Sequence, residues 1–561
     1  MENSIFEGNK AALIAHHQEL LPLVDGKVGF ARNHLVMRGG AVELHRPDGI
    51  VRQIHASKAE EAAADLASKI HYDNVSQSFL VMGAGLGYVP KALFRRLFVG
   101  SPVAHAMLVW EYDPAMFELA MQTTDLRELL MAPNVKFVIG PQARLDMMFY
   151  QLLSRIGGSM QIIKSKWAFE SYPAYEEKMQ TELLPFIKTC ATNIVTVVAF
   201  GELLLSNILE SLPALARYSG VSVLCDMFKG RPAVLVGGGP SLSKNVQLLR
   251  NIEGCAIIIC ADAALKYLLN LGIHPDFVVS VDPQRGTYID KYENVRIPTD
   301  ISLFAHPACS PEIHRNFPGP VFFTGSMMAP FSRFARYFSD AHVIEDDCQC
   351  QMHLSFNLAK FLGCDRIALI GQDLSMKLDR KYYAWDADVA PPEVYAEGKD
   401  VNGEDVITTP VFVDYLNTYA RKIRAYVGKV WQATEGGLAI PGTTTAPLSE
   451  VLDDWGSLGE INIKQKVVEA SKLATVDRDG LMAEMNAVLR RMMMLRIASL
   501  ATAKAPEKIA PRMIEYKRDI SMLPIPPVTG DKFAKLAVMA GVAEQSLRKA
   551  LEELKCQQRN S

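Results

Sequence analysis

Short apolar runs alternate with helix-like segments along most of the chain, and the central runs lead to small, acidic or hydroxyl residues. The run at 255–260 leads to Asp262, and the run at 277–281 leads to Asp282. Short apolar runs bounded by turn residues are typical of buried strands, and their alternation with helical periodicity favours a parallel sheet. Because the carboxyl ends of parallel strands line the edge where ligands bind, we expect both aspartates at a ligand site.

This pattern divides the chain into three expected parts, and the fold class is multi-domain α/β. Residues 1–200 are predicted to form a Rossmann-like unit, and residues 201–458 a central, doubly wound unit. Residues 459–561 change to helical spacing, which predicts a helical C-terminal region. Its helices are expected at 463–474, 478–500, 511–522 and 532–555.

The composition narrows the function classes. The chain has 561 residues and a formal net charge of −3, so no basic excess indicates nucleic-acid binding. Its longest apolar stretches, such as 194–200, are too short to cross a membrane, and residues 1–10 lack a signal-peptide pattern. The nine cysteines are scattered, which indicates free thiols. We expect a cytoplasmic protein, and the sequence leaves open whether it forms a homo-oligomer.

A glycine-rich turn follows the first strand of the central unit. Gly237, Gly238 and Gly239 come first, and Pro240 and Ser241 lead into the next helix. Glycines let a backbone turn approach a phosphate closely, and the amide groups at the start of a helix attract anions. The turn therefore predicts a nucleotide site, to which the Ser241 hydroxyl could contribute.

The two aspartates add a second requirement to that site. Asp262 and Asp282 would bring two carboxylates close to a bound phosphate, and ionised carboxylates only accept hydrogen bonds. Such a pair needs either ribose hydroxyls or a cation such as Mg²⁺ as its partner. Both alternatives stay open, but two acceptor-only side chains beside a phosphate need a compensating charge, which favours Mg²⁺ as the cofactor held by this pair.

A second glycine-rich turn lies near the N-terminus. Gly83-Ala84-Gly85-Leu86-Gly87 follows a strand-like run, and Glu111 ends the next one. This layout resembles the S-adenosylmethionine loop of Rossmann-like methyltransferases, in which a carboxylate accepts from ribose hydroxyls. Because no catalytic group accompanies the loop, a scaffold without a ligand is the favoured interpretation.

The central motifs, taken in order, resemble the motility-associated factor (Maf) glycosyltransferases. The motifs are Gly237–Leu242, Ala261-Asp262, Pro275-Asp276, Val281–Pro283, Leu369–Leu374, Thr434–Gly437 and Gly442-Thr443. Members of that family are implicated in attaching nonulosonic acids of the pseudaminic or legionaminic type to Ser or Thr of flagellin. The resemblance implies a CMP-activated sugar as donor and flagellin as partner.

The central unit is also similar to bacterial sialyltransferases of the Campylobacter type, which suggests roles for individual residues. Asp262 and Asp282 stand where those enzymes hold the nucleotide with two asparagines, and Ser375 replaces their first phosphate-binding tyrosine. Tyr383 stands where those enzymes have their second tyrosine, in a segment that ends at Asp386. Its hydroxyl could donate a hydrogen bond to the departing phosphate. The loop Thr434, Glu435 and Gly436 could contact the sugar or be purely structural.

The general base expected from those enzymes is missing. They use a histidine beyond the second tyrosine, but this chain has no histidine after His353. Asp405, Thr408 and Asp414 lie near its place, and Asp373 is the other candidate. In an oxocarbenium-like reaction the proton leaves late, so a carboxylate could serve as the base. Asp373, Tyr383 and Asp414 are therefore the predicted catalytic residues.

Other features leave further functions open. The segment Cys348–His353 replaces a small-residue turn of the Maf pattern, so its side chains are expected to crowd the donor site. His306, at the end of a strand-like run, is expected to be a structural hydrogen-bonding residue rather than a base. The central unit is more distantly similar to archaeal 6-hydroxymethylpterin diphosphokinases, which implies an alternative activity with ATP and Mg²⁺. A third alternative is a non-catalytic factor that binds flagellin.

Overall fold

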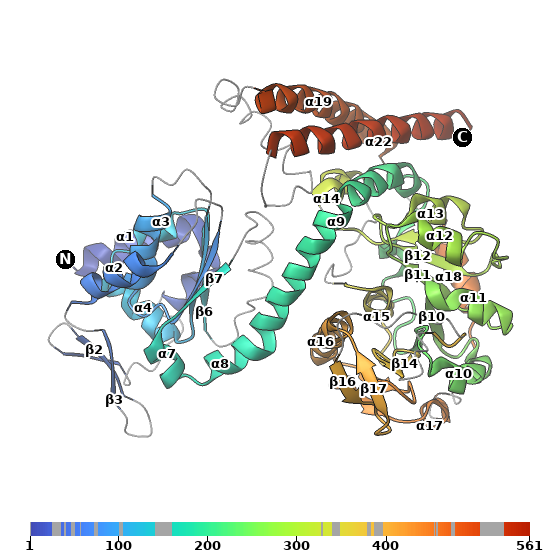
Figure 1. The fold of residues 1–561 in the computed structure, drawn as a ribbon, viewed down its shortest axis with the longest axis horizontal. Helices are drawn as coiled ribbons and strands as arrows, with labels where there is room; N and C mark the ends of the chain where they lie inside the picture. The colour runs from blue at the N-terminus through green and yellow to red at the C-terminus, as the bar shows by residue number, and fades with distance from the viewer. Residues whose placement is uncertain are drawn as a thin grey trace. The chain divides into compact units, whose positions relative to one another are not determined.

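The computed structural model divides the chain into two compact units. One is built on residues 1–194 and the other on residues 195–525 and 531–561 (Figure 1). The residues described are 2–24, 35–38, 41–45, 51–55, 58–71, 77–99, 105–140, 160–326, 329–338, 348–377, 383–385, 396–453, 455, 458–472, 477–504 and 532–560. Asp386 and the helix expected at 511–522 lie outside these residues.

The first unit is a small Rossmann-like domain. Its central parallel sheet has the order β6-β5-β4-β7, formed by Val135–Ile139, Ala106–Glu111, Ser78–Met82 and Met160–Lys164. An antiparallel sheet contains β1 (Leu35–Arg38), β2 (Ala41–His45) and β3 (Val51–His55). The helices are α1 (Glu2–His16), α2 (Ala59–Lys69), α3 (Tyr88–Leu97), α4 (Pro114–Thr123), α5 (Arg127–Leu130), α7 (Lys166–Ser171) and α8 (Ala174–Lys178). The chain passes into the second unit within α9 (Leu184–Leu215).

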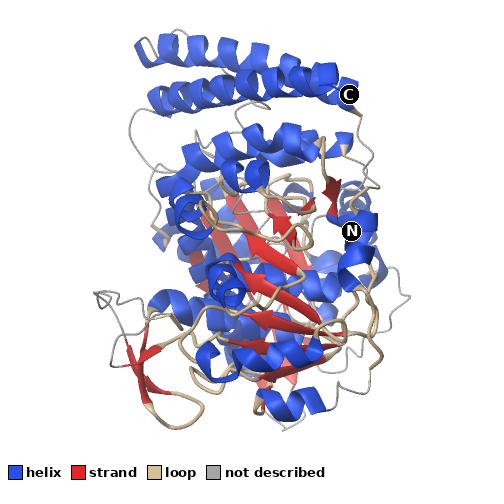
Figure 2. Ribbon diagram, turned by 90° about the vertical axis from the view of Figure 1, so that its right-hand side faces the viewer, coloured by secondary structure: helices blue, strands red, loops and turns tan. Residues whose placement is uncertain are grey.

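The second unit is built on a nine-stranded parallel sheet with the order β19-β18-β14-β9-β10-β11-β12-β13-β8 (Figure 2). Its strands are β8 (Ser219–Gly220), β9 (Pro232–Val236), β10 (Ile257–Ala261), β11 (Phe277–Ser280), β12 (Ser302–Ala305), β13 (Val321–Phe323), β14 (Arg366–Ile370), β18 (Lys429–Gln432) and β19 (Thr444–Thr445). From β9 the chain builds outward through β13 and then returns to add β14 beside β9. Between β9 and β14 the strand order therefore reverses, which is where doubly wound sheets bind ligands.

Helices cover both faces of this sheet. They are α10 (Leu242–Asn245), α11 (Asp262–Asn270), α12 (Arg285–Lys291), α13 (Pro311–Asn316), α14 (Ala329–Phe334), α15 (Gln351–Phe361), α16 (Pro410–Arg424), α17 (Leu448–Asp453) and α18 (Ile463–Ala470). A small antiparallel sheet joins β15 (Met376–Lys377), β17 (Asp405–Thr408) and β16 (Ala396–Lys399). Among the described helices, none combines the length and the apolar character that crossing a membrane requires.

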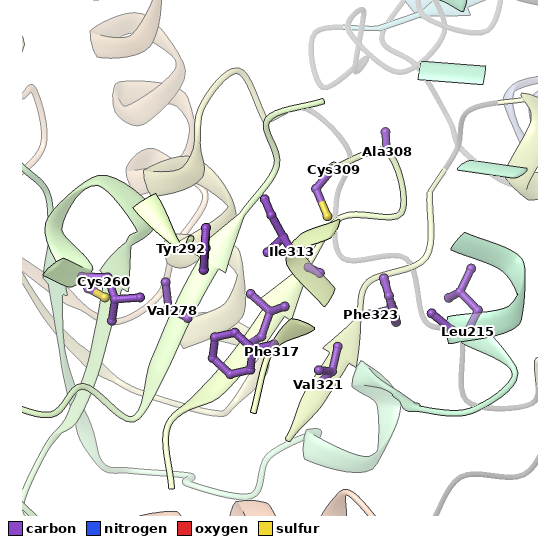
Figure 3. Close-up of a cluster of buried hydrophobic side chains, with 14 of the residues drawn as sticks. Leu215, Cys260, Val278, Tyr292, Ala308, Cys309, Ile313, Phe317, Val321 and Phe323 are labelled. Atoms are coloured by element: carbon purple, nitrogen blue, oxygen red, sulfur yellow. The ribbon is translucent and has the colours of Figure 1, made fainter. Parts of the chain in front are cut away.

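The core consists of two apolar layers, because successive strand residues point to opposite faces of the sheet. Val234 and Ile258 belong to one layer, and their chain neighbours Leu235 and Ile259 belong to the other. Figure 3 shows part of the first layer, where strand residues such as Val278 and Val321 meet Phe317. Strands buried on both faces read as continuous apolar runs, which is why the sequence predicted them.

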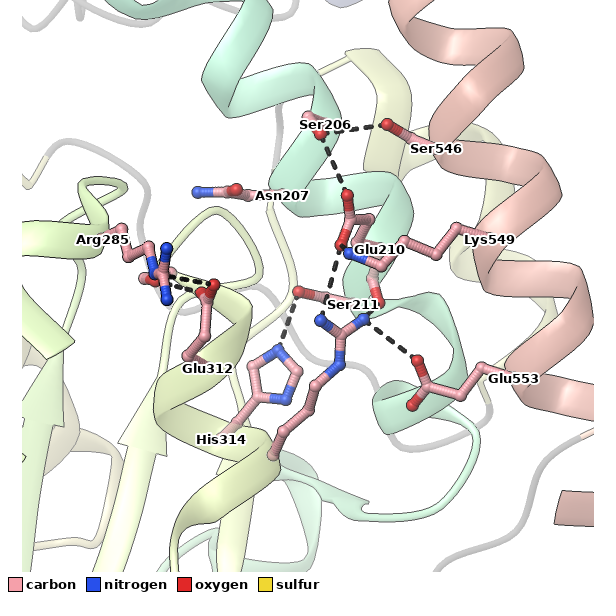
Figure 4. A network of polar contacts seen from close by, with 12 residues as sticks. Ser206, Asn207, Glu210, Ser211, Arg285, Glu312, His314, Ser546, Lys549 and Glu553 are labelled. Carbon is pink, nitrogen blue, oxygen red and sulfur yellow. Dashed lines mark hydrogen bonds and ion pairs between the residues drawn. The ribbon is translucent and has the colours of Figure 1, made fainter. Parts of the chain in front are cut away.

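The C-terminal helices α19 (Arg478–Lys504) and α22 (Lys532–Asn560) pack against each other, and their apolar residues join the first core layer. A polar network also connects α22 to α9 (Figure 4). Glu210 of α9 accepts from Lys549 of α22 and pairs with Arg315, whose other nitrogen lies 3.0 Å from Glu553. The expectation of a multi-domain α/β fold with Rossmann-like, doubly wound and helical parts is confirmed.

Candidate functional site

The loops after β9 and β14 cross at the point where the strand order reverses. The Gly237 amide donates to the Ile370 carbonyl at 2.9 Å, and the Gly239 amide donates to the Gly371 carbonyl at 2.7 Å. A Cβ on Gly237 would stand 2.4 Å from the Gly371 oxygen, and a Cβ on Gly371 would stand 2.4 Å from the Gly237 oxygen. Glycine is therefore required on both sides, because the two backbones touch.

Asp373 lies against the glycine-rich loop and is 8% exposed. The Ser241 hydroxyl donates to Asp373 Oδ2 at 2.8 Å, and the Ser241 amide lies 3.3 Å from Oδ1. Burial raises the pKa of Asp373 to about 6, although the bonds from Ser241 and the charge of Lys244 act in the opposite direction. The anion that the loop holds in this structure is therefore the Asp373 carboxylate. A bound phosphate would have to share or take over the Ser241 donors.

Asp262 and Asp282 follow β10 and β11, next to β9 in the sheet. Asp262, 2% exposed, accepts from the Ser280 hydroxyl at 3.2 Å and from the Gln351 amide at 3.2 and 3.3 Å. Burial raises its pKa to about 6, and the nearby charge of Asp282 acts in the same direction. Asp282 is half-buried and accepts from the Gln284 amide at 2.9 Å.

These residues do not fit the expected Mg²⁺ site as they stand. A cation between Asp262 and Asp282 would meet the amide hydrogens of Gln351, which already face both oxygens of Asp262. Within the described ranges, no group of three or more His, Cys, Asp or Glu side chains is arranged to hold a metal ion. The segment Cys348–His353 thus contacts the site through Gln351, as its position in the sequence suggested.

Tyr383 and Trp385 lie over Gly238. The Ala384 amide donates to the Gly238 carbonyl at 3.1 Å, and the two aromatic rings stack with centroids 4.7 Å apart. A Cβ on Gly238 would stand 3.0 Å from Trp385 Cη2 and 3.2 Å from Tyr383 Cδ1. Lys291 Nζ lies over the Tyr383 ring, 5.5 Å from its centroid. Tyr383 thus adjoins the expected phosphate position, which is where a donor to a leaving phosphate is needed.

The Thr434–Gly436 loop packs against the same two loops. Thr434 Oγ1 donates to the Leu369 carbonyl at 3.4 Å, and Glu435 Oε1 accepts from the Asn245 side-chain amide at 3.0 Å and from the Leu448 backbone amide at 3.2 Å, so both side chains connect the loop to neighbouring segments. Gly436 faces Asp373: a Cβ there would stand 3.5 Å from Asp373 Oδ1. Gly436 is therefore the member of this loop with direct access to the candidate base.

Asp400 was missed in the sequence and also lies close to Gly436. Its Oδ1 accepts from the amides of Asn402 and Glu404, while its Oδ2 is buried without a hydrogen-bond partner. A Cβ on Gly436 would stand 3.9 Å from that Oδ2. The aspartate precedes a turn in a polar stretch, so its sequence pattern is that of an ordinary turn residue.

The remaining candidate bases have other surroundings. Asp405 is exposed on the small antiparallel sheet and pairs with Lys399 at 2.6 Å, and Thr408 Oγ1 donates to the Leu374 carbonyl at 2.9 Å. Asp414 is half-buried in α16. Ser375, which was expected at a phosphate-binding position, instead donates through its hydroxyl to the Asp373 carbonyl at 3.1 Å. Among these candidates, Asp373 is the one whose carboxylate contacts the glycine-rich loop.

His306 has a local role. It ends the β12 run, and its Nδ1 accepts from the Ala308 amide at 3.1 Å, which stabilises the turn. This contact agrees with the structural role expected from the sequence.

Several residues of the N-terminal glycine-rich loop pack closely against other parts of the same unit. Glu111, 1% exposed, accepts from the Gly85 amide at 2.8 Å and from the Asp113 amide at 3.1 Å. A Cβ on Gly83 would stand 2.3 Å from the Ala168 side chain, and a Cβ on Gly87 would stand 2.6 Å from Leu126. Burial raises the pKa of Glu111 to about 8. The carboxylate that would bind a nucleoside thus accepts from an amide of the glycine-rich loop itself.

The sequence comparisons match the central segment of the chain to known proteins. A family model described as 6-hydroxymethylpterin diphosphokinase MptE-like matches residues 206–379. An uncharacterized protein of Treponema pallidum (strain Nichols) is 28% identical over 123 residues, which cover 22% of this chain and 57% of that protein. The 6-hydroxymethyl-7,8-dihydropterin pyrophosphokinase of Methanocaldococcus jannaschii is 35% identical over 83 residues, 14% of this chain and 33% of that enzyme. Both matches therefore span less than two thirds of the relative.

The solved structures extend the likeness to the whole chain. The structure of a Maf glycosyltransferase from Magnetospirillum magneticum AMB-1 aligns with a TM-score of 0.56 over 100% of this chain and 95% of that chain. The sequence identity is 14%, so this match is evidence about the fold. Together the two comparisons confirm the resemblance inferred from the motifs: the chain has the fold of a Maf glycosyltransferase, with an MptE-like segment at its centre.

Proposed function

We propose that this protein is a glycosyltransferase that moves a nonulosonic acid, of the pseudaminic or legionaminic type, from a CMP-sugar donor to Ser or Thr of flagellin. The observation that carries the proposal is the likeness of the whole chain to a Maf glycosyltransferase, with a buried carboxylate against a glycine-rich loop where the strand order reverses. We place the reaction in the cytoplasm, as expected from the sequence.

In this proposal Asp373 is the general base. The bond between the anomeric carbon and the phosphate oxygen breaks, and the acceptor oxygen forms a new bond to that carbon. The acceptor proton then passes to Asp373, and CMP leaves with the electron pair of the broken bond. A pKa of about 6 suits this role, because the carboxylate is ionised at neutral pH but basic enough to take a proton late in the reaction.

Tyr383 and the Ser241 donors would assist the departure of CMP. Negative charge grows on the phosphate as the sugar leaves, and hydroxyl or amide donors aimed at that charge lower the barrier. Tyr383 adjoins Gly238, and Ser241 ends the same loop. Asp262 and Asp282 would accept from ribose hydroxyls. Mg²⁺ is not part of this proposal, because the amide hydrogens of Gln351 face both oxygens of Asp262 and would meet a cation bound there.

The experiment is the intact mass of flagellin coexpressed with this protein and a CMP-nonulosonate pathway. We expect flagellin to gain the mass of one or more nonulosonic acid residues, and the gain to fall strongly with Asp373→Asn. Asp405→Asn is the matched control, because that carboxylate is exposed and paired with Lys399. Unmodified flagellin with the wild-type protein, despite confirmed donor synthesis, would contradict the proposal.

A second function is supported by one observation. The matched pyrophosphokinase of Methanocaldococcus jannaschii and the MptE-like model both fall on the central segment, so we also consider pyrophosphoryl transfer from ATP to a pterin. Incubation with ATP, Mg²⁺ and 6-hydroxymethyl-7,8-dihydropterin tests it directly. AMP formation that depends on the pterin would favour this activity over sugar transfer. A protein that binds flagellin but is inactive in both assays would be a non-catalytic factor.

A further inference from the structure

A pocket of about 220 Å³ opens between α11 and α12, beside the candidate site. Lys266 and Tyr267 of α11 line one side, Asp290 and Lys291 of α12 line another, and Trp385 forms a wall. The Tyr267 and Trp385 rings lie 5.5 Å apart between centroids, tilted by 36°. The pocket therefore combines aromatic walls with charged side chains at its rim.

The pocket and the glycine-rich loop share a wall. Trp385 lines the pocket, and its Cη2 atom would be 3.0 Å from a Cβ on Gly238. Lys291 lines the pocket, and its Nζ also lies 5.5 Å from the centroid of the Tyr383 ring that stacks on Trp385. A molecule whose phosphate bound at the loop would therefore place its adjoining groups near this pocket.

The charges around the pocket favour an anion. Lys266 and Lys291 bring two positive charges, against one negative charge from Asp290, which is exposed. Among the described residues, neither lysine forms an ion pair with a carboxylate. The charge of Lys291 also reaches the site, because it is one of the influences that lower the pKa of Asp262. Two lysines without ion-pair partners beside aromatic walls are suited to a carboxylate on an otherwise partly apolar molecule.

Resting on the proposed function, we propose that this pocket selects the acidic sugar by binding its carboxylate through Lys291 and Lys266. In a nonulosonic acid donor the carboxylate and the phosphate are attached to the same carbon, so the two anionic groups must occupy adjoining sites. Tyr383 and Trp385 both contact Gly238, and Lys291 lies over the Tyr383 ring, so the rim of the pocket at Lys291 is next to the loop. The pocket volume suits the carboxylate end of the sugar, with the aromatic rings against its C–H surface. Lys291 and Lys266 are thus specificity-determining residues.

The test measures by calorimetry how tightly the wild-type protein and Lys291→Met bind two ligands, CMP and CMP-N-acetylneuraminate. We expect the variant to bind the CMP-sugar about tenfold more weakly, a loss of about 1.4 kcal/mol, and to bind CMP within about twofold of the wild type. Lys266→Met should show a smaller difference in the same direction, because that side chain is more exposed. Lys291→Arg should restore most of the sugar-dependent affinity.

The controls separate the two proposals. Lys472→Met, at an exposed lysine after α18, should leave both affinities unchanged. If the wild-type protein binds CMP and the CMP-sugar but Lys291→Met changes neither affinity, or changes both equally, this inference is overturned while the proposed function stands. If the wild-type protein binds neither ligand, the proposed donor is wrong, and the inference fails with it. Equal melting temperatures would show that each variant is folded.

Discussion

At the scale of single residues, the glycine-rich loop is constrained by Asp373 as much as by any ligand. A Cβ on Gly239 would stand 2.0 Å from Asp373 Oδ2, so even alanine would displace the carboxylate. We expect Gly239→Val to abolish CMP binding, measured by calorimetry on folded protein. Gly286→Ala is the matched control, because a Cβ there meets nothing within 4 Å. Unchanged CMP affinity in folded Gly239→Val would contradict the assignment of the loop.

The pH dependence of transfer should report on Asp373. Burial raises its pKa to about 6, so the carboxylate needed as a base is present above that pH and is protonated below it. We expect the transfer rate to fall as the pH falls through about 6. Asp373→Asn should lower the rate by roughly ten- to a thousandfold and remove this dependence. Flagellin glycosylation followed between pH 5 and 8 measures both, and a profile kept by the variant would place the base elsewhere.

Tyr383→Phe tests whether the tyrosine hydroxyl stabilises the departing phosphate, and it leaves the base unchanged. The ring would still stack on Trp385, so the fold should be retained, while the hydroxyl donor is lost. We expect a lower rate, by roughly ten- to a hundredfold, with the pH dependence of the wild type. Melting temperature and glycosylation measured on the same preparation distinguish this from misfolding. A rate equal to that of the wild type would remove Tyr383 from the site.

At the scale of elements, the burial of Asp262 at the start of α11 ties stability to pH. Burial raises the pKa of Asp262 from 3.8 to about 6, although the hydrogen bond from Gln351 of α15 acts in the opposite direction. The folded protein therefore holds this proton more tightly than the unfolded one. The resulting stability is complete below about pH 4 and is lost as the pH rises through about 6, at up to about 1.4 kcal/mol per pH unit. The difference in unfolding free energy between wild type and Asp262→Asn, measured across this range, should show that loss.

The docking of α22 onto α9 depends on Glu210. This carboxylate forms ion pairs with both Lys549 and Arg315. Glu210→Gln would therefore leave two cations without their common partner. We expect faster amide hydrogen exchange in α22 and a loss of about 1–3 kcal/mol of stability. Glu552→Gln, on an exposed face of the same helix, should change neither. Equal exchange in the two variants would show that apolar packing alone holds α22.

At the scale of the whole molecule, the two units have separate cores, and this has a thermal consequence. Leu108 is fully buried in the first unit and Leu235 in the second. Leu108→Ala and Leu235→Ala should each lower the melting temperature of one transition only, by an amount that corresponds to about 2–5 kcal/mol. Scanning calorimetry measures this, and one transition shifted by both changes would mean that the units unfold together.

Much of the fold could be predicted from the sequence, because strands buried on both faces leave unbroken apolar runs. Motif order also placed the loop 237–241 and Asp373 at one sheet edge, where the Ser241 hydroxyl donates to Asp373. The pairings across that edge could not be predicted. Gln351 reaches Asp262 from 89 positions away, and Asp400 approaches Gly436 through a turn. Such contacts depend on how loops cross, which periodicity does not encode.

The closed glycine-rich loop of the first unit bears on how fingerprints of this kind should be interpreted. Gly83 and Gly87 are required there because Ala168 and Leu126 occupy the space that a side chain would need. Purifying selection on such packing would preserve the spacing of a cofactor fingerprint long after any cofactor was gone. A genome survey that assigns methyltransferases by that spacing would therefore also count chains in which packing alone preserves it. The side chains opposite the glycines, small or large, would distinguish an open cradle from a filled one.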